Sequence, residues 1–142
     1  MKVRQRIIDV HAHVIPGVDD GSRTMEESVE MLKRAADQGI VGVIATPHYS
    51  RRHVLKGLND SAKLLQQEIR KTYPKFRIFP GQETFYHDEL AQRLNEGKAY
   101  TMADSQYVLV EFMPSVSYEI LVVAYLFSRK NLEKLKVDYP LI

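Results

Sequence analysis

Short apolar runs typical of buried strands alternate along this chain with longer stretches whose apolar residues recur at helical spacing. The strand-like runs are the one that leads into residues 9–13 and those at 41–45, 76–79 and 107–111. Helical spacing marks the stretches between the first three runs, and a shorter helix precedes the fourth. Strands joined by helices in this way lie parallel with right-handed crossovers, so the sequence predicts an α/β fold with parallel strands.

The first two helices have clear boundaries. Residues 25–38 follow Thr24, which forms a capping box with Glu27, and they end at Gly39. The second helix ends before Pro74. The apolar faces of the two helices are formed by Met25, Val29, Leu32 and Ala36, and by Leu58, Ala62, Leu65 and Ile69.

The later part of the chain gives weaker signals. Asp88 is a suitable N-cap for a short helix that runs through Leu94 and is closed by Gly97. The stretch 118–127 is so apolar that its periodicity fits a buried helix and a strand equally well.

Candidate chemistry begins with the pentapeptide at residues 9–13. Residues two apart in a strand point to the same side, so His11 and His13 present two imidazoles to one space. Two imidazoles placed in this way can bind a metal ion together. Taken alone, the motif has an alternative to metal binding, in which the two histidines are simply solvated polar residues at the end of a strand.

Further candidate ligands stand at the ends of the other strand-like runs. They are His48, Glu83 and Glu111. The C-terminal ends of parallel strands meet at one edge, so we expect these side chains to converge with the N-terminal histidines. Glu111 lies within an apolar run, where a buried carboxylate requires a cation or hydrogen-bond donors. Imidazole and carboxylate ligands without a thiolate favour Mn, Fe or Zn over a structural Cys-type zinc site.

Taken together, these motifs resemble the polymerase-and-histidinol-phosphatase (PHP) family. Within that family they are similar to the bacterial manganese-dependent protein-tyrosine phosphatases of capsule and exopolysaccharide gene clusters. The resemblance covers roughly residues 6–115. Its matching segments are residues 11–13 (HAH), 16–21 (PGVDDG), 45–48 (ATPH), 81–83 (GQE) and 109–112 (LVEF).

The resemblance implies the N-terminal part of a distorted, TIM-like β/α barrel. In the full-length family this barrel holds up to three metal ions, with Mn2+ the expected ion and Fe, Zn and Mg the alternatives. The nucleophile is a metal-activated hydroxide rather than a protein side chain, and the carboxylate that corresponds to Glu83 bridges two ions. Asp19 is expected only to shape its turn. Carried over position by position, the metal ligands are His11, His13, Asp20, His48, Glu83 and Glu111.

The same resemblance implies hydrolysis of phosphotyrosine in a protein substrate, for which a bacterial tyrosine kinase of polysaccharide synthesis is a candidate. Two alternatives stay open: a small-molecule phosphatase of the histidinol-phosphate kind, and a non-catalytic metal-binding fragment. A homo-oligomer is also left open, because residues 30–34 (EMLKR) resemble an oligomerisation element of some of these phosphatases. A surface pair between Glu30 and Arg34 is the simpler interpretation of that segment.

The chain departs from the family after Pro114. The family continues with a His-Pro-Glu-Arg segment and an Asp-x-His, and residues 115–142 contain neither. A full β/α barrel takes about 250 residues, whereas this chain has 142. We therefore expect a single partial PHP domain over 1–142 with a divergent tail over 115–142, as a frameshift or premature stop would produce. For such a chain, weak or absent activity is as readily expected as turnover.

Composition sets outer limits on function. With 20 basic and 18 acidic residues the net charge is +2. This near balance gives no electrostatic reason to expect binding to nucleic acid or to an anionic membrane. The absence of cysteine excludes disulfides and a thiolate nucleophile. No signal peptide is evident, and no stretch approaches the about 20 apolar residues that a membrane helix needs. We therefore expect a cytoplasmic protein that does not insert into membranes.

The remaining histidines, His53 and His87, are expected on the surface. Arg51 and Arg52 precede His53 in the same loop. A contact of either arginine with a phosphate group is the functional alternative to simple solvation of these side chains.

Overall fold

The computed structural model describes residues 6–49, 57–87, 89–112 and 115. These residues form two compact units, each built around a small parallel sheet. The first unit contains residues 6–47 and 57–81, and the second contains the other described residues. The predicted α/β fold with parallel strands is confirmed.

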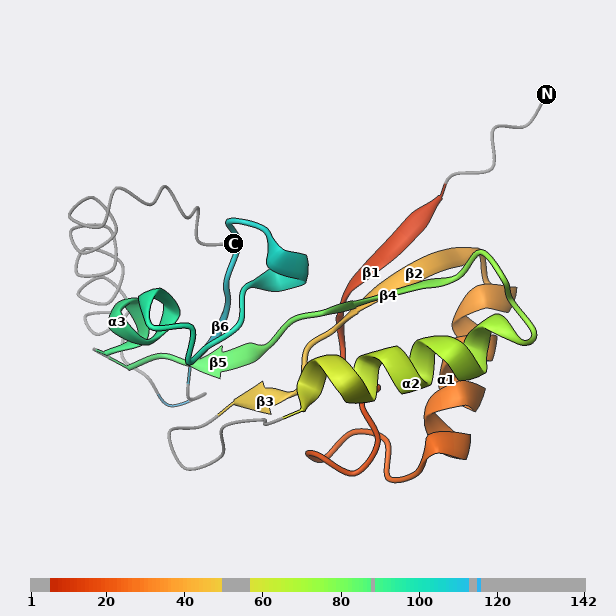
Figure 1. The fold of residues 1–142 in the computed structure, drawn as a ribbon, viewed down its shortest axis with the longest axis horizontal. Helices are drawn as coiled ribbons and strands as arrows, with labels where there is room; N and C mark the ends of the chain where they lie inside the picture. Colours follow the sequence, from red (N-terminus) through yellow and green to blue (C-terminus); the bar gives the residue numbers. More distant parts are fainter. Residues whose placement is uncertain (1–5, 50–56, 88, 113–114, 116–142) are drawn as a thin grey trace. The chain divides into compact units, whose positions relative to one another are not determined.

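The sheet of the first unit has three parallel strands in the order β1-β2-β4. They are β1 (Ile7–Ala12), β2 (Ile40–Ala45) and β4 (Arg77–Pro80), all visible in Figure 1. The predicted strands at 41–45 and 76–79 are found within one residue of their expected bounds. At the C-terminal end of the sheet, Ala12 is paired with Ala45, and Ala45 is paired with Pro80.

The helix α1 (Met25–Asp37) links β1 to β2 and begins as the sequence predicts. Thr24 Oγ1 accepts a hydrogen bond from the Glu27 amide at 3.2 Å, and Glu27 Oε2 accepts one from the Arg23 amide at 2.8 Å. The backbone N–H of Glu26 and the Thr24 hydroxyl hold the pKa of the Glu26 carboxyl below its usual value. The cap therefore satisfies one of the donors that a helix leaves without intrahelical partners at its start, and the Glu27 carboxylate in turn accepts from the residue just before the N-cap.

The helix α2 (Leu58–Arg70) packs on β4 and against α1, while α1 packs on β2 (Figure 1). Gln66 connects α2 to the edge strand: its Nε2 donates to the Phe76 carbonyl at 2.9 Å, and its Oε1 accepts from the Ile78 amide at 2.8 Å. All four residues of the predicted apolar face are buried, namely Leu58, Ala62, Leu65 and Ile69. On α1, Leu32 is buried, and the other three predicted core positions are half-buried.

The second unit contains the parallel sheet β3-β5-β6. Its strands are β3 (His48–Tyr49), β5 (Glu83–Phe85) and β6 (Leu109–Glu111). The unit also contains the short helix α3 (Leu90–Asn95) and a 3-10 turn at Met102–Asp104. A small core is formed by Leu90, Ala99 and Val108, with Leu94 and Val110 packed against it.

The strands β3 and β5 are absent from the sequence-based prediction, which treated His48 and Glu83 as residues that follow a strand. In the structure each of them begins a new short strand. The break before β5 occurs at Gly81, whose amide donates to the Ala45 carbonyl at 2.9 Å. The break before β3 occurs at Pro47, which has no amide hydrogen to continue a ladder. Strands of two or three residues are too short to produce a period-two pattern.

Several predictions fall outside the residues that the structure describes: the cap at Asp88, the apolar stretch 118–127, the surface position of His53 and the phosphate contacts of Arg51 or Arg52. The closed barrel also remains a prediction. The short helix predicted to start after Asp88 is found, with Glu89 at its N-cap position. Among the described helices, none has both the length and the apolar character required to cross a bilayer.

Replacement of Thr24 by alanine tests the cap of α1. We expect Thr24→Ala to lower the free energy of unfolding by about 1 kcal/mol, because one amide of the first turn loses its acceptor. Urea denaturation followed by circular dichroism measures the change. Thr24→Ser, which keeps the hydroxyl, is the control and should retain most of the stability; equal losses in both variants would contradict a capping role.

Candidate metal centre

The sheet β3-β5-β6 places three predicted ligands on one of its faces. In the parallel register His48 is paired with Glu83, and Phe85 is paired with Glu111. Paired residues of neighbouring strands point to the same face, as do residues two apart in one strand. His48, Glu83 and Glu111 therefore share a face although they belong to three different strands.

The three side chains are close enough to hold one ion. His48 Nδ1 lies 3.1 Å from Glu83 Oε2 and 3.3 Å from Glu111 Oε2. One ligand atom from each residue lies within 4.8 Å of the other two. The side chain of Glu83 is only 8% exposed, whereas those of His48 and Glu111 are about 30% exposed. The group is therefore buried on one side and open on the other.

The chemistry of this donor set fits a divalent cation. Two carboxylates at such short range repel each other when both are ionised, and burial raises the cost of their charge. A cation offsets both effects, and one imidazole with two carboxylates suits Mn, Fe or Zn. The buried Glu111 Oε2 makes no hydrogen bond of standard geometry among the described residues; it faces His48 Nδ1 at 3.3 Å, as two ligands of one ion would.

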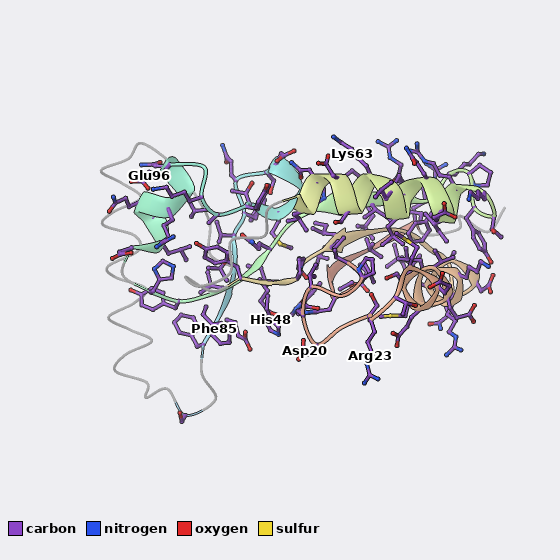
Figure 2. All side chains as sticks on the ribbon, turned by 60° about the horizontal axis from the view of Figure 1, so that its bottom comes forward. Asp20, Arg23, His48, Lys63, Phe85 and Glu96 are labelled. Atoms are coloured by element: carbon purple, nitrogen blue, oxygen red, sulfur yellow. The ribbon has the colours of Figure 1, made fainter. Side chains whose placement is uncertain are left out.

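Phe85 supports the position of His48. The two rings are nearly parallel, with 5.9 Å between their centroids and 15° between their planes. Figure 2 shows the two side chains next to each other. Stacking of this kind restricts rotation of the imidazole, so the apolar residue keeps Nδ1 of His48 directed at the carboxylates.

The first unit holds the second group of predicted ligands. Nε2 of His11 lies 3.1 Å from Nε2 of His13, so the two imidazoles point to the same place, as predicted. One ion can span two nitrogens at this separation with bonds of about 2.0–2.1 Å. Thr46, which is fully buried, fixes the backbone between them: its Oγ1 accepts from the Ala12 amide at 3.1 Å, and its amide donates to the Ala12 carbonyl at 2.9 Å.

The two aspartates after this histidine pair occupy different environments. The side chain of Asp19 is only 5% exposed, and its Oδ2 lies 2.9 Å from His13 Nδ1. Asp20 is 80% exposed, and its Oδ1 lies 3.9 Å from the same nitrogen. Figure 2 shows Asp20 directed outward from its loop. The sequence-based assignment of Asp19 to the turn was therefore incomplete, because this carboxylate also contacts an imidazole.

The loop carrying these aspartates folds back onto His13. The Ser22 amide donates to the His13 carbonyl at 3.1 Å, and the Gly17 amide donates to the Ser22 carbonyl at 2.8 Å. A Cβ added at Gly21 would lie 2.2 Å from the carbonyl oxygen of His13 and 2.5 Å from its Cβ. Only glycine allows this approach, so Gly21 is required here for space.

The structure thus brings His11 and His13 together in one unit, and His48, Glu83 and Glu111 together in the other. A single centre formed by both groups remains a prediction. His87 was expected on the surface, and this was wrong, because the residue is half-buried with both ring nitrogens inaccessible. Sequence reasoning missed the roles of Asp19 and Phe85. For Asp19 the signal was available, since a carboxylate six residues after a candidate ligand can reach it across a tight loop.

Comparison with known proteins identifies the family. Residues 7–126 match the family model described as capsular polysaccharide synthesis, CpsB/CapC. The chain belongs to the CpsB/CapC family.

Individual relatives agree with this assignment. The chain is 32% identical over 109 residues to tyrosine-protein phosphatase YwqE of Bacillus subtilis, a match that covers 75% of this chain and 43% of that protein. It is 31% identical over 120 residues to tyrosine-protein phosphatase CpsB of Streptococcus pneumoniae, covering 79% of this chain and 47% of CpsB. The chain therefore spans about half the length of the curated relatives it matches.

A solved structure shows the same fold. It comes from work on YwqE and CpsB described as unique metal-dependent tyrosine phosphatases, and it aligns with a TM-score of 0.75 at 31% identity. The alignment covers 87% of this chain and 52% of the solved chain. The α/β fold of this chain is thus that of metal-dependent tyrosine phosphatases.

Replacement of Gly21 by alanine tests the close approach of the loop to His13. We expect Gly21→Ala to lower the free energy of unfolding by about 3 kcal/mol, because the added methyl group must displace backbone. Denaturant titration measures it. In the control, Gly39→Ala, the new Cβ has open space and meets only the strain of a positive φ of 97°, so its loss should be smaller, about 1–2 kcal/mol. If Gly21→Ala loses no more stability than Gly39→Ala, the steric explanation is wrong.

Proposed function

We propose that this CpsB/CapC chain carries metal ligands of a protein-tyrosine phosphatase, and that it hydrolyses phosphotyrosine when these ligands hold divalent cations. The ligands are His11, His13, Asp20, His48, Glu83 and Glu111. The observation that carries the proposal is the group His48, Glu83 and Glu111 on one sheet face, inside a chain whose relatives are named tyrosine-protein phosphatases.

The metal ions supply, when bound, a water of lowered pKa and positive charge against the phosphoryl oxygens. The residues of the chain hold and direct the ligand atoms. Glu83 is the most buried of the carboxylates proposed as ligands, so it would hold a bound ion from the most fixed position. Phe85 keeps the His48 ring in place by stacking. The chain contains no cysteine, so these residues supply no thiolate nucleophile of their own.

Mn2+ is the ion we propose, with Fe, Zn and Mg as the alternatives that the same donor set accepts. A phosphotyrosine protein is the proposed substrate, and a bacterial tyrosine kinase of polysaccharide synthesis is the proposed source of it. The match to a capsular polysaccharide synthesis family supports this choice. We further propose that the protein acts in the cytoplasm.

Metal removal tests the proposed reaction. We expect the purified chain, after treatment with a chelator, to release no phosphate from a phosphotyrosine peptide, and added Mn2+ to restore release. A phosphoserine peptide and histidinol phosphate, assayed in parallel, should be hydrolysed more slowly. Faster turnover of histidinol phosphate would support the small-molecule alternative. Metal binding without any turnover would support a non-catalytic metal-binding chain.

Replacement of Glu83 tests the metal site independently of activity. Glu83→Gln keeps the size of the side chain but removes a charge from the ligand group. We expect the affinity for Mn2+, measured by calorimetry, to fall by more than the about 10- to 100-fold typical for loss of an outer-shell partner.

The matched control is Glu68→Gln, a partly exposed helix residue paired with Lys71. It should bind Mn2+ as the unmodified chain does. If Glu83→Gln also binds Mn2+ normally, Glu83 is not a ligand.

A further inference from the structure

Asp19 uses its two carboxylate oxygens for two different partners. Oδ1 accepts a hydrogen bond from the Gly21 amide at 3.0 Å, while Oδ2 lies 2.9 Å from His13 Nδ1. The side chain is 5% exposed, so these contacts are largely shielded from water. The first contact shapes the turn, and the second acts on a predicted metal ligand.

We propose that Asp19 is a positioning residue that fixes the tautomer of His13, so that Nε2 presents a lone pair toward Nε2 of His11. The purpose of this arrangement rests on the proposed function, because a cation bound there requires a lone pair on Nε2. The tautomer itself can be observed in the metal-free protein.

The tautomer follows from the donor and acceptor properties of the groups. An ionised carboxylate only accepts, so the nitrogen beside it, Nδ1 of His13, must carry the proton. A neutral imidazole has one N–H and one lone pair, which leaves the lone pair on Nε2. In the metal-free protein the proton between the two Nε2 atoms, 3.1 Å apart, then belongs to His11. Carboxylates that hold ligating histidines in this way are common at metal sites.

The loop gives Asp19 a fixed position from which to act. Ser22, fully buried, donates its amide to the His13 carbonyl, and its Oγ lies 2.6 Å from the Oγ of buried Ser28 on α1. Ser28 Oγ in turn donates to the Thr24 carbonyl at 3.1 Å. The loop is thereby tied to the start of a helix on one side and to His13 on the other.

The substitution Asp19→Asn separates the two roles of this side chain. The Gly21 amide still needs an acceptor, so the amide oxygen of the asparagine takes the place of Oδ1, and its NH2 group then faces His13 Nδ1. An NH2 group only donates, so His13 must accept at Nδ1 and carry its proton on Nε2. The turn survives, but the lone pair of Nε2 is lost. Asp19→Ala would also remove the turn acceptor and is less informative.

Nitrogen-15 NMR of histidine-labelled, metal-free protein at about pH 8.5, well above the ordinary histidine pKa, reads the tautomer directly. In the unmodified chain we expect His13 Nδ1 to be the protonated nitrogen and Nε2 the unprotonated one. In Asp19→Asn the two should exchange. The control Asp60→Asn removes the same charge from an exposed position on α2 and should change neither nitrogen.

Calorimetric titration with Mn2+ completes the test. Affinity should fall about 10- to 100-fold in Asp19→Asn and remain unchanged in Asp60→Asn. The positioning role is overturned if His13 of the unmodified chain is protonated on Nε2, or if Asp19→Asn leaves its tautomer unchanged. If the tautomer exchanges as expected but neither chain binds Mn2+, the positioning role of Asp19 stands and the proposed metal-dependent function fails.

Discussion

The parallel pairing of β3, β5 and β6 is the constraint on which the candidate site depends. It brings an imidazole and two carboxylates from distant parts of the chain to one sheet face, within 4.8 Å of one another. Two ionised carboxylates at this range are unfavourable without a positive charge between them, and the burial of Glu83 increases that cost. The sheet therefore holds an arrangement that a bound cation would stabilise and that ordinary core packing would not.

The arrangement around His11 and His13 depends on a different feature, which is the close packing of a loop against the strand that precedes it. Gly21 allows the backbone to lie against His13, and Ser22 secures it there through the His13 carbonyl. Once the loop is in this position, Asp19 reaches the imidazole without an additional element of structure. Here the backbone positions a side chain that contacts a candidate ligand, whereas in the second sheet the strand register positions the candidate ligands themselves.

Elements with long, regular patterns were predictable from the sequence. The capping box at Thr24 and the buried face of α2, from Leu58 to Ile69, are found as expected, because local hydrogen bonds and a period of 3.6 residues determine them. The short strands β3 and β5 were not predictable, since their pairing is set by partners far away in the chain. The partial burial of His87, with both ring nitrogens inaccessible, was missed for the same reason.

The sequence by itself determined the helices, the parallel α/β class, the family and the identity of the candidate ligands. The helices and the fold class follow from the spacing of apolar residues, and the family and the candidate ligands follow from short motifs. Only the tertiary structure decided which ligand atoms approach each other and which neighbours hold them. His48 meets Glu83 through strand register, and Asp19 rather than Asp20 makes the short contact with His13 through the loop. The physical reason is that distances between side chains depend on backbone pairing across the fold, and strands of two or three residues are too short for a local pattern to specify that pairing.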